Sequence, residues 1–155
     1  MDVNAQNGDG VSALDMAGAE NQLACVKLLV DAKANPDKPN AEDGLSSLHC
    51  AVGSDYVEIA AFLIDNGADI NKQSTQAGLT PLMKAVMHNH PQSVKLLLER
   101  KAITSVRATG GAYQGKTAID LANELKREDI AALLRAAAAQ NGDSKSVSAL
   151  WVVLL

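Results

Sequence analysis

The feature that most constrains the fold of this chain is an eight-residue pattern that occurs four times. Each copy begins with Gly and continues with Ser or Thr at the third position, Leu or Ile at the fifth and Ala at the eighth. The copies are GVSALDMA (10–17), GLSSLHCA (44–51), GLTPLMKA (78–85) and GKTAIDLA (115–122), with starts 34, 34 and 37 residues apart. A second apolar block follows each copy at a constant distance. Self-similarity at this period is typical of repeat proteins, so we expect four units, each of two short helices and a loop.

The composition agrees with small, closely packed helices. Of the 155 residues, 47% are apolar, 21% are charged and only 3% are aromatic, which favours an all-α fold over a sandwich or barrel. The net charge of -4 offers no basic surface for nucleic acid or an anionic membrane, so neither is expected as a partner. The N-terminus lacks a secretory signal, and no apolar run is long enough to span a bilayer. We therefore expect a cytoplasmic protein, with the nucleus open to it by passive entry.

The 34-residue period also fits the tetratricopeptide repeat, but that family needs large aromatic residues along two longer helices, and too few are present. The sequence resembles the ankyrin repeat, whose signature is Gly-x-Thr-Pro-Leu-His-x-Ala followed by Val-x-Leu-Leu-Leu-x-x-Gly-Ala-Asp-Val-Asn. The best matches are GLTPLMKA at 78–85, and Leu63 with GADIN at 67–71. The resemblance implies an all-α, ankyrin-repeat solenoid of stacked antiparallel helix pairs, joined by hairpin-like loops that we call fingers.

The resemblance covers about residues 9–138 and predicts the domain organisation. We expect repeats at about 9–42, 43–76, 77–113 and 114–138, with residues 1–8 as the remnant loop of a preceding repeat. The first helix pair should therefore leave apolar surface uncovered, whereas the polar residues 126–129 can cap the last pair. Residues 139–148 are predicted to form a flexible linker and 149–155 (ALWVVLL) an apolar tail. Docking of the tail on the stack, its continuation into a missing segment, and its use as a partner-binding peptide all stay open.

Local signals predict where the helices lie, at about 12–20, 23–32, 46–53, 57–66, 80–88, 91–101, 117–125 and 127–138. A hydroxyl residue precedes the first helix of each unit, where it can cap exposed backbone N–H groups, and Pro81 suits a first helical position. The resemblance places a left-handed residue between the two helices of each unit. These positions hold Asn21, Asp55, Asn89 and Lys126, and the second helices end at Lys33, Gly67 and Lys101. The finger at 103–115 is three residues longer than those at 35–44 and 69–78, and we expect it to be the most mobile.

One segment, GGAYQGKT at 110–117, satisfies the phosphate-binding pattern Gly-x-x-x-x-Gly-Lys-Thr. A nucleotide-binding protein would need a buried strand before this loop and a later strand ending in Asp to hold magnesium. The only candidate for the first strand is the weak segment 102–106, and the 38 residues after Thr117 contain no candidate for the second. Because the segment is also in phase with the other repeat starts, nucleotide binding is kept only as an alternative function.

Other reactive residues have structural interpretations. Cys25 and Cys50 are expected to be reduced core residues, and His88 and His90 are too close in sequence to face one metal ion. His49 falls on the signature His of the family, which hydrogen-bonds backbone to fix the loop before its helix, and His90 on the family's turn His. No catalytic group, metal site or cofactor is predicted, so we expect no enzyme and no small-molecule substrate.

The remaining candidate is a protein-binding surface. In the ankyrin family, which this sequence resembles, partners bind the finger tips and the exposed face of each first helix. In this sequence, the residues after the four signature glycines are Val11, Leu45, Leu79 and Lys116, an apolar ladder along the fingers that ends in a cation. Alternatively, this ladder packs between neighbouring fingers. The strongest contacts are expected from Met87, His88 and Tyr113, since such residues are common in interfaces. The predicted partner-binding residues are Glu42, Asp43, Leu45, Ser54, Gln73, Gln76, Leu79, Met87, His88, Tyr113, Gln114, Lys116 and Glu124.

Charge varies along the fingers. Residues 35–45 carry three acids and one Lys, net -2; residues 69–79 carry one acid and one Lys, net 0; residues 103–116 carry two cations, net +2. Such a gradient would orient a partner.

Asn71 lies in a segment that looks like those hydroxylated in other ankyrin proteins. The sequence thus predicts a non-catalytic protein-protein interaction module, an adaptor, scaffold or inhibitor, with a recognition fragment of a larger protein as a further alternative.

Overall fold

The structure, a computed structural model, describes residues 1–140. These residues form eight α-helices in four pairs, one short 3-10 helix and no strand beyond a single bridge between Gln6 and Ser12, so the all-α prediction is confirmed. The elements are α1 (Ala13–Ala19), α2 (Leu23–Asp31), α3 (Ser47–Gly53), α4 (Val57–Asp65), α5 (Pro81–Met87), α6 (Pro91–Glu99), η1 (Gly111–Tyr113), α7 (Ala118–Glu124) and α8 (Glu128–Gln140).

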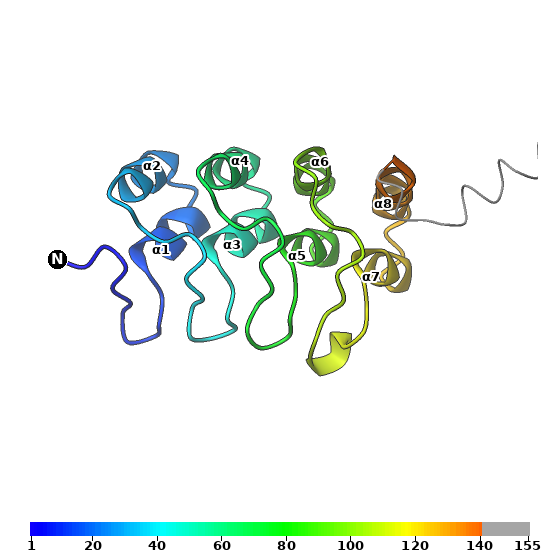
Figure 1. The fold of residues 1–155 in the computed structure, drawn as a ribbon, viewed down its shortest axis with the longest axis horizontal. Helices are drawn as coiled ribbons and strands as arrows, with labels where there is room; N and C mark the ends of the chain where they lie inside the picture. The colour runs from blue at the N-terminus through cyan, green and yellow to red at the C-terminus, as the bar shows by residue number, and fades with distance from the viewer. Residues whose placement is uncertain (141–155) are drawn as a thin grey trace, which may run out of the picture.

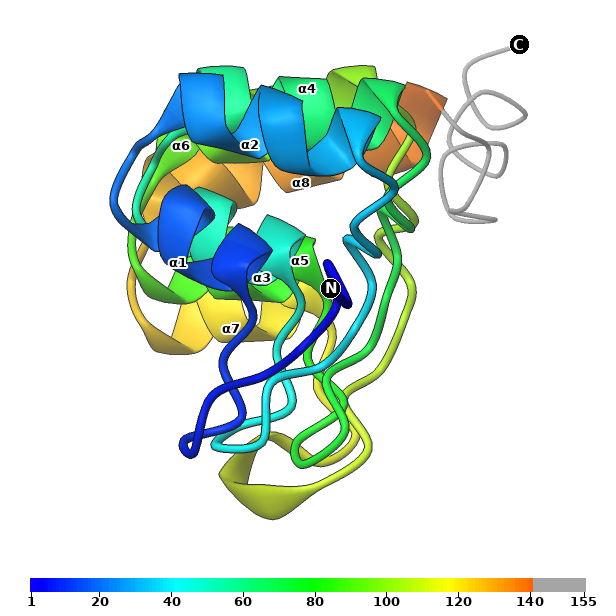
Figure 2. The same ribbon diagram turned by 90° about the vertical axis from the view of Figure 1, so that its left-hand side faces the viewer.

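The helix pairs stand side by side in a row (Figure 1). The first helices, α1, α3, α5 and α7, form one layer, and the second helices, α2, α4, α6 and α8, form the other, while the fingers project away from both layers (Figure 2). Each pair packs only against its neighbours, as in a solenoid. Within residues 1–140, none of the helices has the length and apolar composition needed to cross a membrane.

The first helices begin where the hydroxyl residues predict. Ser12, Thr80 and Thr117 each accept a hydrogen bond from the backbone N–H three residues later, at 3.2, 3.2 and 3.4 Å, and Pro81 occupies a first-turn position. Capping satisfies donors that have no partner inside the helix. At the start of α3 the ring of His49 accepts from Ser46 N–H at 3.2 Å, where carboxylates of Asp15 and Asp120 accept at the starts of α1 and α7.

The left-handed turn positions are also confirmed. Asn21, Asp55, Asn89 and Lys126 have φ of 55°, 59°, 60° and 56°. At the ends of the second helices, Lys33 and Lys101 adopt φ of 71° and 64°, where Gly67 has 96°. Non-glycine residues are strained in this region, with Asn and Asp strained least. The repeat geometry therefore overrides the preference of the three lysines.

Neighbouring fingers pack backbone against backbone at the signature glycines. Gly44 O accepts from Thr75 N at 3.2 Å, and a Cβ at Gly44, where φ is +70°, would lie 1.9 Å from Thr75 Oγ1. A Cβ at Gly10 or Gly78 would likewise overlap Ala41 or Thr109 of the next finger. The pattern keeps Gly here because the next finger occupies the space of a side chain. The longer third finger contains η1, and its expected mobility stays a prediction.

Some expectations about the ends require correction. Cys25 is exposed and Cys50 is half-buried, so Cys25 is not a core residue. It lies on the outer side of the first pair, where no repeat covers it. Helix α8 runs to Gln140, two residues into the segment predicted as a linker. The rest of that segment and the tail at 149–155 lie outside the described residues.

Candidate partner-binding surface

The predicted contact residues differ in how far they reach the surface. Six are exposed: Glu42, Ser54, Gln76, His88, Gln114 and Glu124. Five are half-buried: Asp43, Gln73, Met87, Tyr113 and Lys116. The exposed and half-buried residues lie on the fingers or at the last turns of first helices, and together we call them the finger–helix face.

Leu45 and Leu79 do not belong to this face. Both are only 6% exposed, so the expectation that they form an apolar contact ladder is corrected, and their burial agrees with the alternative of packing between neighbouring fingers. Each follows a signature glycine with positive φ and closes its finger, because its carbonyl accepts from Asn40 N–H or Ser74 N–H at 2.9 Å. Their apolar side chains are available to the core and not to a partner.

Two glutamines of the second finger hold its neighbours. Gln73 Nε2 donates to Gly78 O at 2.8 Å and to Arg107 O, in the third finger, at 2.9 Å. Gln76 Nε2 donates to Glu42 O in the first finger. These bonds satisfy carbonyls that have no sheet partner. Gln73 is therefore a structural residue first, whereas Gln76 still exposes part of its side chain.

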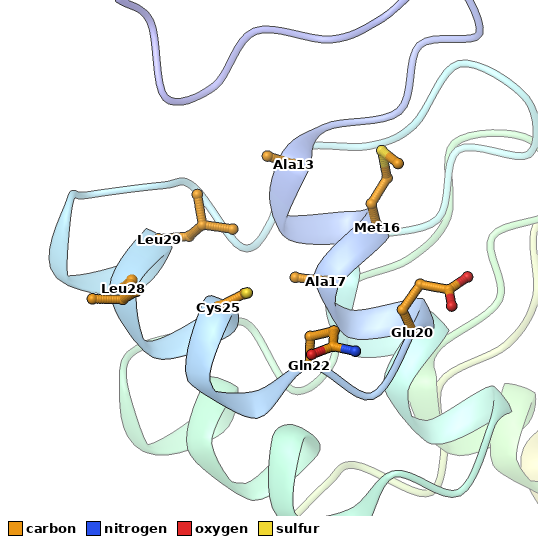
Figure 3. Close-up of a pocket in the computed structure, with 8 residues that line it drawn as sticks. All are labelled: Ala13, Met16, Ala17, Glu20, Gln22, Cys25, Leu28 and Leu29. Atoms are coloured by element: carbon orange, nitrogen blue, oxygen red, sulfur yellow. The ribbon is translucent and has the colours of Figure 1, made fainter.

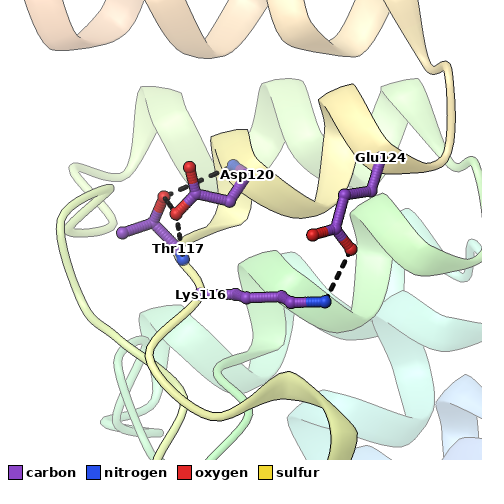
Figure 4. Close-up of polar contacts among 4 residues, drawn as sticks. All are labelled: Lys116, Thr117, Asp120 and Glu124. Atoms are coloured by element: carbon purple, nitrogen blue, oxygen red, sulfur yellow. Dashed lines mark hydrogen bonds and ion pairs between the residues drawn. The ribbon is translucent and has the colours of Figure 1, made fainter.

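Lys116 and Glu124 form the clearest polar contact of this face. Lys116 Nζ lies 2.7 Å from Glu124 Oε2, so the Lys side chain joins the base of the third finger to the last turn of α7 (Figure 4). Thr117 and Asp120 cap the start of the same helix, since Asp120 Oδ2 accepts from both Thr117 N and Thr117 Oγ1 at 2.8 Å. These hydrogen bonds lower the pKa of Asp120. The Lys and Thr of the phosphate-binding pattern thus have protein partners, which argues against the nucleotide alternative.

The three histidines are placed differently. His88 is exposed and its ring stacks on that of His90, with centroids 6.0 Å apart, while His90 Nε2 reaches Gly53 O at 3.0 Å. Partial burial lowers the pKa of His88, helped by the nearby charges of Lys84 and His90. Among the described residues, no group of three His, Cys, Asp or Glu side chains is arranged to hold a metal ion.

His49 has the structural role expected of it and a second bond besides. Its Nδ1 accepts from Ser46 N–H, which leaves the proton on Nε2 to donate to Leu79 O of the next finger at 2.8 Å. Burial lowers the pKa of His49 to about 4, so the ring is neutral near pH 7. A neutral His49 therefore joins the start of α3 to the following repeat.

Met87 and Tyr113 are only half-buried, yet both pack against the hydrophobic core. Their truncation should cost stability as well as contact area, so they are poor choices for testing a surface.

Two cations near this face, Lys84 and Arg107, are not among the contact residues predicted from the sequence. The alkyl chain of Lys84 lies over Gly53 of the preceding repeat, and Arg107 Nη1 donates to Gly115 O at 2.6 Å. The sequence signal for Lys84 was its charge, because the same position of the repeat pattern holds Met16, Cys50 and Leu121 in the other units.

The finger charges are less separated than the sequence predicts. In the third finger, the Lys116 charge is paired with Glu124, which lies outside the residues counted for that finger. The acidic first finger keeps Glu42 exposed, while Asp37 accepts from Asp69 N–H at 2.9 Å. The gradient is therefore weaker at its basic end.

Asn71 Oδ1 accepts a hydrogen bond from Ile103 N–H at 2.8 Å, and the hydroxylation of Asn71 stays a prediction.

Comparison with known proteins agrees with this architecture. A family model described as ankyrin repeats (many copies) matches residues 14–64 and again 48–98, together more than half of the chain. The chain belongs to the ankyrin repeat family. A search of curated proteins found no match. The fourth unit lies beyond the matched residues, and its membership rests on its in-phase pattern and on the α7–α8 pair.

Proposed function

We propose that this chain is a non-catalytic interaction domain that binds a partner protein through the finger–helix face. Ankyrin repeats generally mediate protein-protein interaction, and the chain belongs to that family. The observation that carries the proposal is that all four repeats contribute exposed polar side chains to this face, while the backbone beneath them is fixed by capping and by inter-finger bonds. A rigid scaffold with adaptable side chains suits recognition.

The best-placed contact residues are those whose side chains are exposed and make no core contact. Ser54 and His88 lie at the ends of α3 and α5, at corresponding places in consecutive repeats, and Gln114 lies at the third finger. Changing Ser54 and His88 should alter the face without altering the packing below it. Met87 and Tyr113 would then contribute through the exposed part of their side chains.

A matched pair of double variants tests the proposal. The first, Ser54→Arg with His88→Glu, changes the finger–helix face. The second, Glu58→Arg with Lys95→Glu, changes exposed positions on α4 and α6, and each pair leaves the net charge unchanged. A partner captured by the wild-type chain should bind the first variant at least about tenfold more weakly and the second equally well. Loss with the second variant only, or retention by both, would refute the proposed surface.

The nucleotide alternative makes a different prediction. If Lys116 bound a nucleotide, magnesium and ATP would raise the melting temperature in a saturable way that Lys116→Ala abolishes. We expect no such shift, since the Lys116 ammonium is paired and Thr117 caps α7. A third alternative, a recognition fragment of a larger protein, would leave the surface unchanged and add activity elsewhere in that protein.

A further inference from the structure

The outer side of α1 and α2 carries an apolar hollow of about 510 Å³ (Figure 3). Leu28 is 69% exposed and Met16 54% exposed, so two large apolar side chains face solvent. A second hollow, of about 560 Å³, shares Ala13 and Leu29 with the first. We call this surface the N-terminal face. The residues that line the first hollow are Ala13, Met16, Ala17, Glu20, Gln22, Cys25, Leu28 and Leu29.

The repeat position of Cys25 is buried wherever another repeat precedes it. Cys25 is exposed, whereas its counterparts Ile59, Ser93 and Ile130 are 0%, 0% and 1% exposed. Leu28 is exposed, whereas its counterpart Leu96 is 8% exposed and the other two, Phe62 and Leu133, are half-buried. The N-terminal face is therefore shaped to be covered, and apolar surface of this extent marks an interaction site.

The opposite end of the stack, formed by α7 and α8, is poorly suited to cover the N-terminal face of a second copy. In the first three repeats, one position on the second helix holds Val30, Ile64 and Leu98, all packed against the core. In the fourth repeat, Arg135 holds this position, is exposed, and donates to Asn123 Oδ1 at 2.9 Å. Stacking the α7–α8 end of a second copy on the N-terminal face would bring this guanidinium against an apolar surface, at a large desolvation cost.

The chain itself contains a more suitable occupant, the segment ALWVVLL at 149–155. All seven of its side chains are apolar, and they include the single Trp of the protein. We propose that the segment 149–155 of one copy docks on the N-terminal face of a second copy. Trp151 enters the hollow, where Leu28, Leu29 and Met16 contact its ring. Glu20 and Gln22, together at one end of the hollow, offer acceptors for the indole N–H (Figure 3).

Chain length favours docking between copies. Three repeat spacings of 8–10 Å and the radius of the first pair separate α8 from the N-terminal face by about 30–35 Å. The eleven steps from Gln140 to Trp151 span at most about 40 Å when fully extended, and an irregular chain of this length spans about 18 Å on average. A segment docked on its own copy would need a straight linker, at a high entropic cost. A second copy carries no such restriction.

Trp151 is the single Trp of the protein, so the Trp fluorescence of the full-length chain reports the environment of this residue directly. Emission should shift to the blue as protein concentration rises, and sedimentation velocity should show association over the same range. Leu28→Glu should raise the midpoint at least about tenfold, since it places a charge in the hollow. The matched control is Ile103→Glu, which changes an exposed apolar residue of the third finger and should leave the midpoint unchanged. Leu150→Asp should act as Leu28→Glu does.

Cys25 supplies an independent readout, because it lines the hollow and is exposed. Burial raises the pKa of Cys50 to about 12, so a thiol reagent at pH 8 modifies Cys25 selectively. Modification of Cys25 should slow by roughly tenfold once the free protein concentration exceeds the dissociation constant about tenfold.

Three results would overturn the proposal. A blue-shifted emission that is independent of concentration and insensitive to Leu28→Glu would place the segment on its own copy, for example in the groove between α6 and α8 near Gln140. Emission typical of a solvated indole at all concentrations would show that the segment does not dock. Association that protects Cys25 without any change in Trp151 emission would mean that two N-terminal faces meet directly.

Discussion

At the residue scale, one repeat position is filled by an Asp in two repeats and by His49 in another, and both kinds of side chain close a helix start. Asp15 and Asp120 close the starts of α1 and α7 with a carboxylate oxygen, and His49 closes α3 with Nδ1. Its other nitrogen reaches Leu79 O in the following finger. The ring must be neutral to accept at one nitrogen and donate at the other, so this joint depends on protonation state.

The stability of the protein should therefore fall as pH drops below the ordinary pKa of His. The pKa of His49 is about 4 in the fold and 6.5 when unfolded. Between these values the unfolded chain binds the proton and the fold does not, so the unfolding free energy is highest above pH 6.5 and decreases by up to about 3 kcal/mol toward pH 4. Urea denaturation across this range measures the loss.

Two variants separate His49 from other titrating groups. His49→Gln should flatten the dependence between pH 6.5 and pH 4.5 at the cost of lower stability throughout. His88→Gln should leave most of the pH dependence of the unfolding free energy in place, because His88 is exposed. An unchanged dependence in His49→Gln would assign the effect to another group.

Glycine positions give a second prediction at this scale. Gly44 and Gly67 both have positive φ, but only Gly44 touches the next finger. Gly67→Ala should cost about 1 kcal/mol from backbone strain alone. Gly44→Ala should cost about 1–3 kcal/mol more, because its Cβ would overlap Thr75. Equal losses of unfolding free energy in the two variants would mean that the fingers separate easily.

At the element scale, the four helix starts are alike in sequence and unequal in their connections. Asp15 is buried and accepts from Ser12 N at 3.0 Å, from Ser12 Oγ at 2.7 Å and from Ser47 Oγ of the next repeat at 2.6 Å. Asp120 makes the local bonds only, since no described repeat follows α7 and α8. The first of these carboxylates therefore joins two repeats and the second closes one helix.

The two carboxylates should differ in their effect on stability. Asp15→Ala should cost about 3 kcal/mol, because it leaves buried hydroxyl and N–H donors without an acceptor. Asp120→Ala should cost about 1 kcal/mol, as for the loss of a helix cap. Chemical denaturation of both variants measures the difference, and a larger loss for Asp120→Ala would contradict this ranking.

The sequence predicts these elements well because their causes are local. Ser12 and Thr80 mark helix starts from side-chain chemistry within a few residues. The left-handed turns at Asn21 and Asn89 follow from the family resemblance, and Asn tolerates that conformation. The burial of Leu79 was not predictable in this way, since it depends on a glycine φ and on the packing of neighbouring fingers. The exposure of Cys25 was missed for a related reason: its surroundings along the chain resemble those of buried Ile59, and only the presence of a preceding repeat distinguishes them.

At the scale of the whole molecule, the stack has two inner repeats and two ends. The pairs α3–α4 and α5–α6 are covered on both sides, whereas α1–α2 is covered on one (Figure 1). In a one-dimensional stack, local stability follows the number of neighbour interfaces. The Leu28→Glu variant suits this test because its N-terminal face should stay uncovered. Its amide hydrogen exchange should be slowest in α3–α6 and faster in α1 and α2. Uniform protection of all the helices would show that the stack unfolds as a single unit.

The finger–helix face is the central functional element of this account, and a hydrogen-exchange footprint of a captured partner tests it most directly. Binding at this face should slow exchange at the finger tips and in the last turns of α3 and α5, around Ser54 and His88. Exchange in α4 and α6, on the other layer, should change little. Protection confined to the second helices or to the N-terminal face, with the fingers unchanged, would contradict the account.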